Sequence, residues 1–170
     1  ICGGRSLNGV KYRVMDDRIE ALTWIVYGAV SGGNIQINHV PFDAMAVPLI
    51  HLESCGINIL KNPDQANITR SCLVNDKISP FEVACGTYPG VISDMQPFFV
   101  VLGLNAMGTS IIHDYRYPDR ILYLSELQKL LPANCLHWEK GRITTKGIVE
   151  FTGGTVDSTD LRGSMAAILG

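Results

Sequence analysis

The chain repeats its own residue pattern at an offset of 77, and an internal repeat constrains the fold more than any single motif. Four identities follow from this offset, namely Asp17 with Asp94, Ala29 with Ala106, Ile35 with Ile112, and Pro41 with Pro118. Each copy opens a mostly apolar helix at an aspartate and then passes into a short alternating strand. We therefore expect an α/β protein built from repeated βαβαββ units.

The repeat also sets the expected domain organisation. We predict one partial domain over 1–170, with a first repeat at about 9–76, a second at about 77–148 and the start of a third at about 149–170. The third copy is expected to stop after its first helix. The chain begins without a methionine and ends directly behind an apolar stretch, so both ends are expected to be cut.

Local start and stop signals predict the individual elements. Helices are expected at 17–33, 43–54, 94–108, 119–131 and from 160 to the end, and strands at 11–15, 34–38, 57–60, 69–74, 77–85, 110–114, 135–138 and within 142–151. The segment 61–67 reads as a turn because it combines Asn, Pro and Asp. Asp17 is a good N-cap with Glu20 placed as in a capping box.

Composition excludes several classes of protein. The chain has 46% hydrophobic residues and a formal net charge of -2, which suits a folded core and gives no basic surface for nucleic acid or anionic membranes. No uncharged apolar run approaches the roughly 18 residues of a membrane span. No targeting leader is visible, so a cytoplasmic protein is expected.

The cysteines and histidines give no sign of a metal or a disulfide framework. The five cysteines are widely spaced without a Cys-x-x-Cys pair, and the four histidines lack ligand spacing. We expect buried free thiols, no metal and no cofactor. The spacing of the cysteines does not exclude that one of them is a nucleophile. No GxGxxG or GxxxxGK[ST] pattern occurs, so neither a Rossmann nor a P-loop nucleotide site is expected.

The three helix-opening aspartates allow two interpretations. An aspartate at an N-cap accepts backbone N–H bonds and suits the helix dipole, which is worth about 1 kcal/mol without any function. Asp17 fits this structural interpretation best. Asp94 and Asp160 follow irregular approaches, TYPGVIS and TVDST, and loops at one end of a layered α/β unit often carry chemistry.

Four segments of the chain resemble the enolpyruvyl transferases. They are DRIEALTWIVYGAVSGGNI, YPGVISDMQPFFVVLGLNAMGTSII, the Pro-Asp-Arg before ILYLSELQKL, and STDLRGSMAAILG. The Asp-Met-Gln and Thr-Asp-Leu-Arg patterns are typical of the branch that acts on UDP-N-acetylglucosamine. The resemblance covers essentially the whole chain but about two-fifths of such an enzyme. It implies an inside-out α/β barrel domain, with helices inside and sheets outside, and a missing N-terminal domain.

The resemblance implies transfer of enolpyruvyl from phosphoenolpyruvate to a hydroxyl of a nucleotide sugar, in peptidoglycan precursor synthesis. Asp94 would bind that hydroxyl and act as general base, and Asp160 would be a second carboxylate near the reacting carbon. Arg120 and Arg162 would bind the donor's anionic groups, which suit a guanidinium. The general acid would be a loop cysteine of the other domain, and none of the five cysteines here matches it.

Three more residues are implied with less specific roles. Asp17 and Arg18 match a pair that would line the cleft, and the backbone at Arg116 falls where the family touches its nucleotide sugar. Arg18 is explained equally well as an exposed arginine in the first turn of a helix, without a role in the cleft. The chain has Tyr88 where the peptidoglycan branch has His, and its RYPDR loop differs from the usual form. A paralogue that uses another uridine nucleotide, or a non-catalytic binding module, therefore remains open.

Overall fold

The computed structural model describes residues 3–4, 6 and 8–170. Its α-helices are α1 (Arg18–Ser31), α2 (Ala46–Ser54), α3 (Gln96–Leu104), α4 (Leu122–Gln128) and α5 (Leu161–Leu169). Its strands are β1 (Ile35–Asn38), β2 (Leu60–Lys61), β3 (Gln65–Ile68), β4 (Glu82–Gly86), β5 (Val91–Ile92), β6 (Thr109–Asp114), β7 (Leu136–Glu139) and β8 (Arg142–Lys146).

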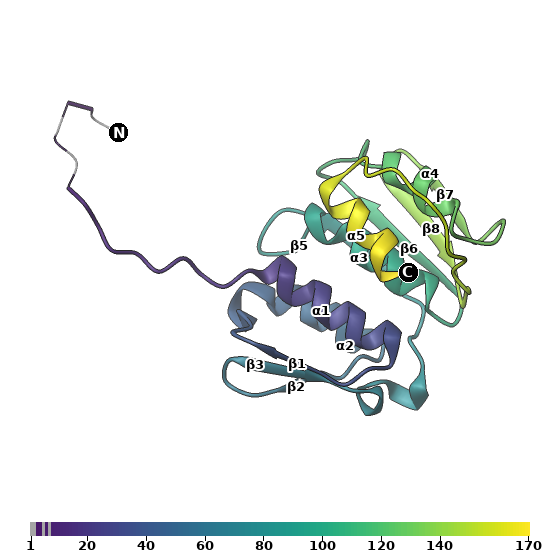
Figure 1. The fold of residues 1–170 in the computed structure, drawn as a ribbon, viewed down its shortest axis with the longest axis horizontal. Coiled ribbons are helices and arrows are strands. Elements are labelled where there is room, and N and C mark those ends of the chain that lie inside the picture. Colours follow the sequence, from purple (N-terminus) through teal and green to yellow (C-terminus); the bar gives the residue numbers. More distant parts are fainter. Residues whose placement is uncertain (1–2, 5, 7) are drawn as a thin grey trace.

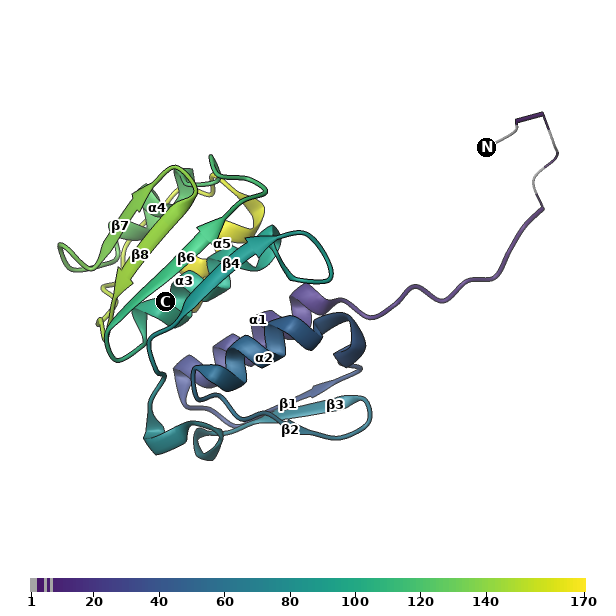
Figure 2. The same cartoon turned by 180° about the vertical axis from the view of Figure 1, so that it is seen from behind.

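The strands form two sheets on opposite sides of a helical layer (Figures 1 and 2). One sheet has the order β1-β3-β2 and is antiparallel throughout. The other has the order β5-β4-β6-β8-β7, in which β4 runs parallel to both β5 and β6 and the remaining pairs are antiparallel. The helices therefore lie inside and the sheets outside, as the repeat and the resemblance led us to expect.

Local capping explains where two of the inner helices begin and end. The Asp17 carboxylate accepts hydrogen bonds from the backbone N–H groups of Ile19 (2.7 Å) and Glu20 (3.3 Å), and α1 ends at Gly32 with a left-handed φ of 65°. Asp160 caps α5 in the same way, accepting from the backbone of its first turn. These two starts and the stop at Gly32 agree with the sequence signals.

A single hydrophobic core joins the two sheets through the helices. Leu22 and Ile25 of α1 and Phe98 and Leu102 of α3 are completely buried, and they belong to the same cluster. Burial of each such side chain contributes about 1.5–3 kcal/mol. Every residue of α3 is buried, because α1 and α5 pack against it and the larger sheet covers it. This central position fixes the start of α3, where Asp94 lies.

The strand expectations were wrong in several places: the strand expected at 77–85 begins only at Glu82, and β5 was not expected. Residues 11–15 form no strand, because nothing pairs with them, and 57–60 contributes only an isolated bridge and the first residue of β2. The supposed turn 61–67 contains most of β3, which is held between β1 and β2 with Ala66 and Ile68 fully buried. Residues 69–74 form 3-10 turns instead of a strand.

Two helices and the cysteines also differ in detail from expectation. The helix expected at 119–131 begins only at Leu122, and residues 42–45 and 93–95 are 3-10 turns ahead of α2 and α3. The four cysteines at positions 55, 72, 85 and 135 are buried free thiols, whereas Cys2 lies outside the described residues. Across the described part of the chain, no helix is long and apolar enough to cross a membrane.

Candidate functional site

Three loops meet where α3 and α5 begin, and they carry four of the expected site residues. Asp94 lies in the 3-10 turn Ser93–Met95, Arg120 lies in the loop between β6 and α4, and Asp160 and Arg162 flank the start of α5. Contacts between α3 and α5 bring these segments together although up to 68 residues separate them. The sequence prediction that these four residues share one site is consistent with this arrangement.

Arg120 links the two carboxylates. One terminal nitrogen of its guanidinium donates a hydrogen bond to Asp94 Oδ1 at 2.8 Å, and its Nε lies 3.3 Å from Asp160 Oδ2. The same terminal nitrogen also donates to the backbone carbonyl of Ser93 at 3.1 Å. The side chain of Arg120 is 21% exposed, so this cation is partly desolvated but still reachable from solvent. A charge-assisted contact of this kind is stronger than a neutral hydrogen bond.

Arg162 adds a second cation to Asp94. Its Nε lies 3.5 Å from Asp94 Oδ2, and this buried nitrogen forms an ion pair without a hydrogen bond. Partial burial alone would raise the pKa of Asp94, but the hydrogen bond and charge of Arg120 and the charge of Arg162 outweigh it. The pKa of Asp94 is therefore lowered, and its carboxylate is ionised at neutral pH.

The aspartates differ in what their side chains do. Asp17 only caps its helix, whereas Asp160 caps α5 through Oδ1 and contacts Arg120 through Oδ2. Asp94 makes no capping hydrogen bond to the turn or helix that it opens. The N-cap interpretation therefore holds for Asp17, holds in part for Asp160 and is wrong for Asp94.

A buried aspartate that sequence reasoning missed holds the Arg120 loop in place. Asp114, at the end of β6, is 3% exposed and its Oδ1 accepts the backbone N–H groups of Arg116 (3.0 Å) and Tyr117 (2.8 Å). Its other oxygen accepts the hydroxyl of buried Ser93, the residue before Asp94. An aspartate at the end of a strand, directly before an irregular loop, is a signal for this type of turn.

A second pair of buried polar groups supports the site from the helix side. The Tyr123 hydroxyl donates to Gln96 Oε1 at 2.7 Å, and both side chains are almost completely buried. The Gln96 side-chain amide lies 3.4 Å from the backbone carbonyl of Arg120, which it approaches as a donor. These contacts connect α3 and α4 with the loop that carries the guanidinium.

An open cavity of about 440 Å³ lies beside the cluster. Its lining consists of Arg116, Tyr117, Pro118, Asp119, Arg120, Leu122, Tyr123, Thr159 and Asp160. The Tyr117 ring packs against two guanidinium groups, with centroid distances of 5.1 Å to Arg116 and 5.4 Å to Arg120. Arg116 therefore lies at the edge of this cavity, next to the charged cluster.

Asp17 and Arg18 do not join the charged cluster. Asp17 lines a different cavity with residues of β1. The guanidinium of Arg18 lies over the ring of Tyr88, 5.1 Å from its centroid, in the loop between β4 and β5. Arg18 thus contacts the segment that leads to Asp94 without reaching the carboxylate. Within the described residues, no group of three or more His, Cys, Asp or Glu is arranged to hold a metal ion.

The chemistry available at this site follows from its charges. Two arginines and two aspartates share a partly buried space, so the guanidinium groups suit an anionic ligand such as a phosphate or a carboxylate. Asp94, ionised and 37% exposed, is able to accept a proton from a bound hydroxyl.

Comparison with known proteins gives one family. The profile of EPSP synthase (3-phosphoshikimate 1-carboxyvinyltransferase) matches residues 1–170. Similar proteins named UDP-N-acetylglucosamine 1-carboxyvinyltransferase include one from Methylacidiphilum infernorum, 32% identical over 98% of this chain and 38% of that protein. One from Campylobacter lari is 33% identical over the same shares. The chain thus spans about two-fifths of the length of these relatives.

A solved structure shares the fold. The enolpyruvyl transferase NikO from Streptomyces tendae superposes with a TM-score of 0.79 over 92% of this chain and 36% of its own, at 24% sequence identity. The α/β fold expected from the repeat is therefore confirmed, and the family resemblance noted from the four sequence segments is confirmed by the family profile. The repeat boundaries given above stay a prediction.

Proposed function

This chain belongs to the EPSP synthase (3-phosphoshikimate 1-carboxyvinyltransferase) family, and we propose that it is part of an enzyme that transfers an enolpyruvyl group from phosphoenolpyruvate to a hydroxyl group. The observation that carries this proposal is the placement of Arg120 between Asp94 and Asp160, with Arg162 beside Asp94. One group of charges supplies both cations for an anionic donor and a carboxylate for the acceptor hydroxyl.

The proposed reaction proceeds by addition and elimination. A proton adds to the methylene carbon of phosphoenolpyruvate, and the acceptor oxygen forms a bond to the adjacent carbon. The carbon–oxygen bond to phosphate then breaks, and the new methyl group loses a proton. In this scheme Asp94 takes the proton of the acceptor hydroxyl, Arg120 and Arg162 stabilise the donor's negative charge, and Asp160 lies near the reacting carbon. The acid that protonates the methylene carbon is proposed to lie in the part of the enzyme outside this chain.

The proposed acceptor is UDP-N-acetylglucosamine, because that substrate appears in the names of the relatives quoted above. With this acceptor, the proposed role is in cytoplasmic peptidoglycan precursor synthesis, and so in cell wall biogenesis, cell shape and cell division. A second candidate is a paralogue that uses another uridine nucleotide. It is favoured by the RYPDR loop, because Arg116 and Tyr117 of that loop line the cavity beside the charged cluster.

The test uses the full-length protein of which this chain is part. We expect phosphate release from phosphoenolpyruvate with UDP-N-acetylglucosamine, and loss of that release in Asp94→Asn with an unchanged circular dichroism spectrum. Glu53→Gln is the matched control, since its carboxylate is exposed and pairs with Lys61 away from the cluster. Wild-type turnover in Asp94→Asn would remove Asp94 from the mechanism.

A panel of other uridine nucleotides in the same assay identifies the acceptor. The isolated chain is expected to release no phosphate, because the proposed general acid lies outside it. Phosphate release by the isolated chain, or failure of the full-length protein to use any uridine nucleotide, would contradict the proposal.

A further inference from the structure

Tyr123 lies where the three segments that carry the charged cluster meet. Its hydroxyl donates a hydrogen bond to Gln96 Oε1 at 2.7 Å, and Gln96 is the first residue of α3, two positions after Asp94. Arg120 lies three positions before Tyr123 in the chain. The Tyr123 ring also lies against Gly163 in the first turn of α5, so closely that a Cβ on Gly163 would overlap it. One side chain therefore connects all three parts of the site.

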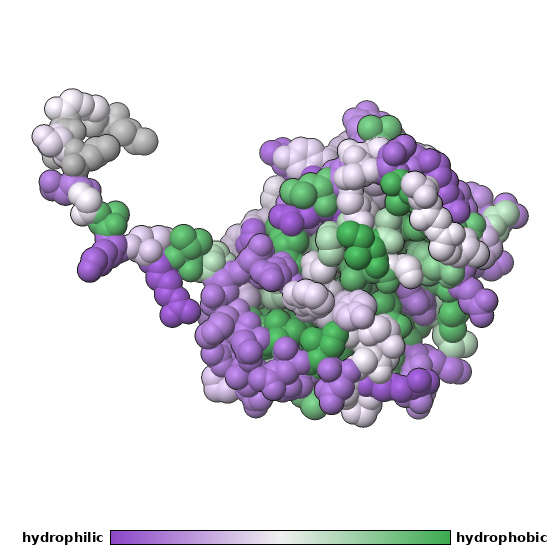
Figure 3. Space-filling view, in the orientation of Figure 1, coloured by the Kyte–Doolittle hydropathy of each residue, from purple (hydrophilic) through white to green (hydrophobic). Residues whose placement is uncertain are grey.

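The contact at Gly163 extends to the carboxylate of Asp160. The backbone N–H of Gly163 donates to Asp160 Oδ1 at 2.7 Å, while Asp160 Oδ2 lies 3.3 Å from Arg120 Nε. The buried residues of α5 are Gly163 and Ala166, and apolar surface is visible over this helix in Figure 3. Because few residues of α5 are buried, the contact of its first turn with Tyr123 fixes where the Asp160 carboxylate lies.

The hydroxyl of Tyr123 and the amide of Gln96 meet in a place that water hardly reaches. The two residues are 3% and 1% exposed. Burial raises the pKa of the Tyr123 phenol well above its usual range, so the hydroxyl keeps its proton and donates the hydrogen bond. A buried acceptor that loses its donor has no water to replace it, which makes such a bond costly to break. The hydrogen bond therefore fixes the start of α3 against α4.

The first copy of the repeat forms its helices without this pair. At the offset of 77, Gln96 falls on Ile19 and Tyr123 falls on Ala46. Ile19 lies in the first turn of α1 and is buried in the core, whereas Ala46 opens α2 and is exposed. Neither side chain is able to form a hydrogen bond. The fold of the repeated unit therefore does not require a tyrosine and a glutamine at these positions.

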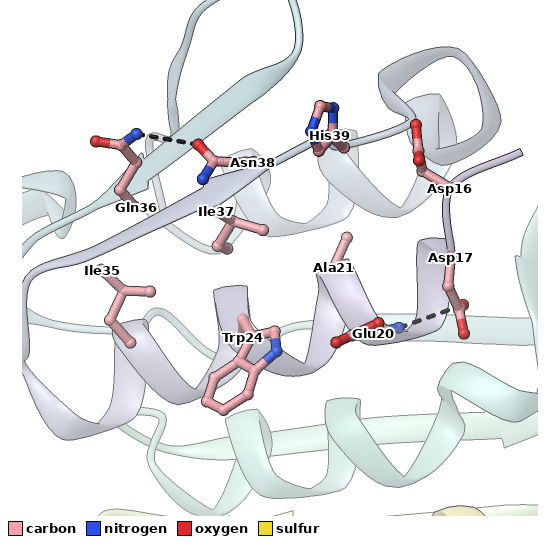
Figure 4. Close-up of a pocket in the computed structure, with 10 residues that line it drawn as sticks. All are labelled: Asp16, Asp17, Glu20, Ala21, Trp24, Ile35, Gln36, Ile37, Asn38 and His39. Atoms are coloured by element: carbon pink, nitrogen blue, oxygen red, sulfur yellow. Dashed lines mark hydrogen bonds between the residues drawn. The ribbon is translucent and has the colours of Figure 1, made fainter.

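The pair occurs together with the arginine. At the same offset Asp94 falls on Asp17, and Arg120 falls on Asp43. Figure 4 shows the start of α1, where Asp17 accepts from the backbone of Glu20 and the ten labelled residues include no arginine. Of the two copies, the one whose aspartate contacts an arginine is thus the one with the tyrosine and the glutamine. This association points to a role in the charged cluster.

We propose that Tyr123 is a positioning residue for the transfer proposed above: it holds the starts of α3 and α5 where both aspartates reach Arg120. It acts through Gln96 on the side of Asp94 and through Gly163 on the other side. The effect on turnover rests on the proposed function, whereas the effect on the geometry of the cluster does not. A displacement of about 1 Å among such groups lowers turnover by as much as about 100-fold.

A carboxyl carbon NMR titration of Asp94 in the full-length protein tests the geometry. Tyr123→Phe keeps the ring against Gly163 and removes the hydroxyl, so it releases the start of α3 from α4. The pKa of Asp94 is expected to rise, because its contact with Arg120 weakens while its burial remains. Gln96→Met removes the same hydrogen bond from the other side. It should raise this pKa as well, and the double variant should raise it no further.

Two variants control for the substitution and for a loss of stability. Tyr27→Phe removes the hydroxyl of a tyrosine that is 40% exposed on α1, and Ile57→Val shortens a fully buried residue of the same core. Both are expected to leave the pKa of Asp94 unchanged. An unchanged pKa in Tyr123→Phe, or an equal rise in Ile57→Val, would overturn the proposal.

Phosphate release by the full-length protein gives the second readout. Tyr123→Phe is expected to lower kcat by roughly 10-fold to 100-fold, with smaller changes in the KM values of the two substrates, because it disturbs the alignment of the reacting groups. Wild-type kcat in Tyr123→Phe would refute the positioning role while leaving the proposed function intact. If the unsubstituted protein released no phosphate, the proposed function would fail, and the pKa of Asp94 would still decide the role of Tyr123.

Discussion

Removal of the Asp114 carboxylate tests whether this buried group holds the site together. In Asp114→Ala, three donors lose their acceptor: the Ser93 hydroxyl and the backbone N–H groups of Arg116 and Tyr117. Hydrogen bonds to a charged group contribute about 1.5–3 kcal/mol each, and partial access of water to the loop reduces their sum. We therefore expect the free energy of unfolding to fall by roughly 3–5 kcal/mol, which is a large part of the 5–15 kcal/mol of a typical domain.

Urea unfolding of this chain, followed by circular dichroism, measures the effect. With an m-value of about 2 kcal/mol/M, the expected loss lowers the midpoint by roughly 1.5–2.5 M urea. Ser93→Ala is the control, because it removes one donor and leaves the two backbone contacts of Asp114, so it should cost about 1 kcal/mol. A midpoint for Asp114→Ala within about 0.5 M of the wild type, at unchanged m-value, would refute the view that Asp114 organises the loop.

Three further predictions concern the same region. In Arg120→Gln the pKa of Asp94 should rise, because burial then acts without its main opposing partner, and a carboxyl carbon NMR titration measures this. Since that pKa is lowered in the folded wild type, Asp94 stabilises the fold above its unfolded pKa, and this contribution disappears as the pH falls through the folded pKa. Gly163→Ala should destabilise the chain, because the new methyl group overlaps the Tyr123 ring and the cost of about 1–3 kcal/mol exceeds the gain of up to about 1 kcal/mol in helix propensity; an unchanged urea midpoint would contradict this. The Cys85 thiol should react with a disulfide reagent only after unfolding, because burial and then the Asp114 charge raise its pKa.

The sequence predicted the helices better than the strands, and the reason is the range of the signals. Asp17 and Gly32 mark the two ends of α1 through contacts within a few residues, so the signal is local. The β3 segment contains Gln and Asn and follows a Pro-Asp pair, which favours a turn, but pairing with β1 and β2 makes it a strand. That pairing depends on residues up to 33 positions away, which periodicity over a short window does not detect.

The candidate site shows the same limit. The repeat and the resemblance pointed to Asp94, Arg120, Asp160 and Arg162, which the structure brings together, because each lies beside a recognisable motif. Asp17 carries the same helix-start signal as Asp160 and caps its helix in the same way, but Asp160 also contacts Arg120 through its second oxygen. The sequence already favoured Asp17 as a cap, but side-chain partners across loops are set by tertiary packing, so it did not show that Asp160 both caps α5 and contacts Arg120.

The ion pairs of Arg120 have a consequence for how tightly an anion is held. A free arginine side chain gives up about 2 kcal/mol of rotamer entropy when it is fixed. Here Asp94 and Asp160 hold the guanidinium before any ligand arrives, so that entropic cost is met during folding. An incoming anion meets a guanidinium whose charge is already shared with these two carboxylates through Nε and one terminal nitrogen, so its affinity reflects competition with them for that charge. The affinity should therefore depend little on the loss of rotamer entropy of Arg120. It should depend strongly on how well the ligand competes with Asp94 and Asp160 as a hydrogen-bond acceptor.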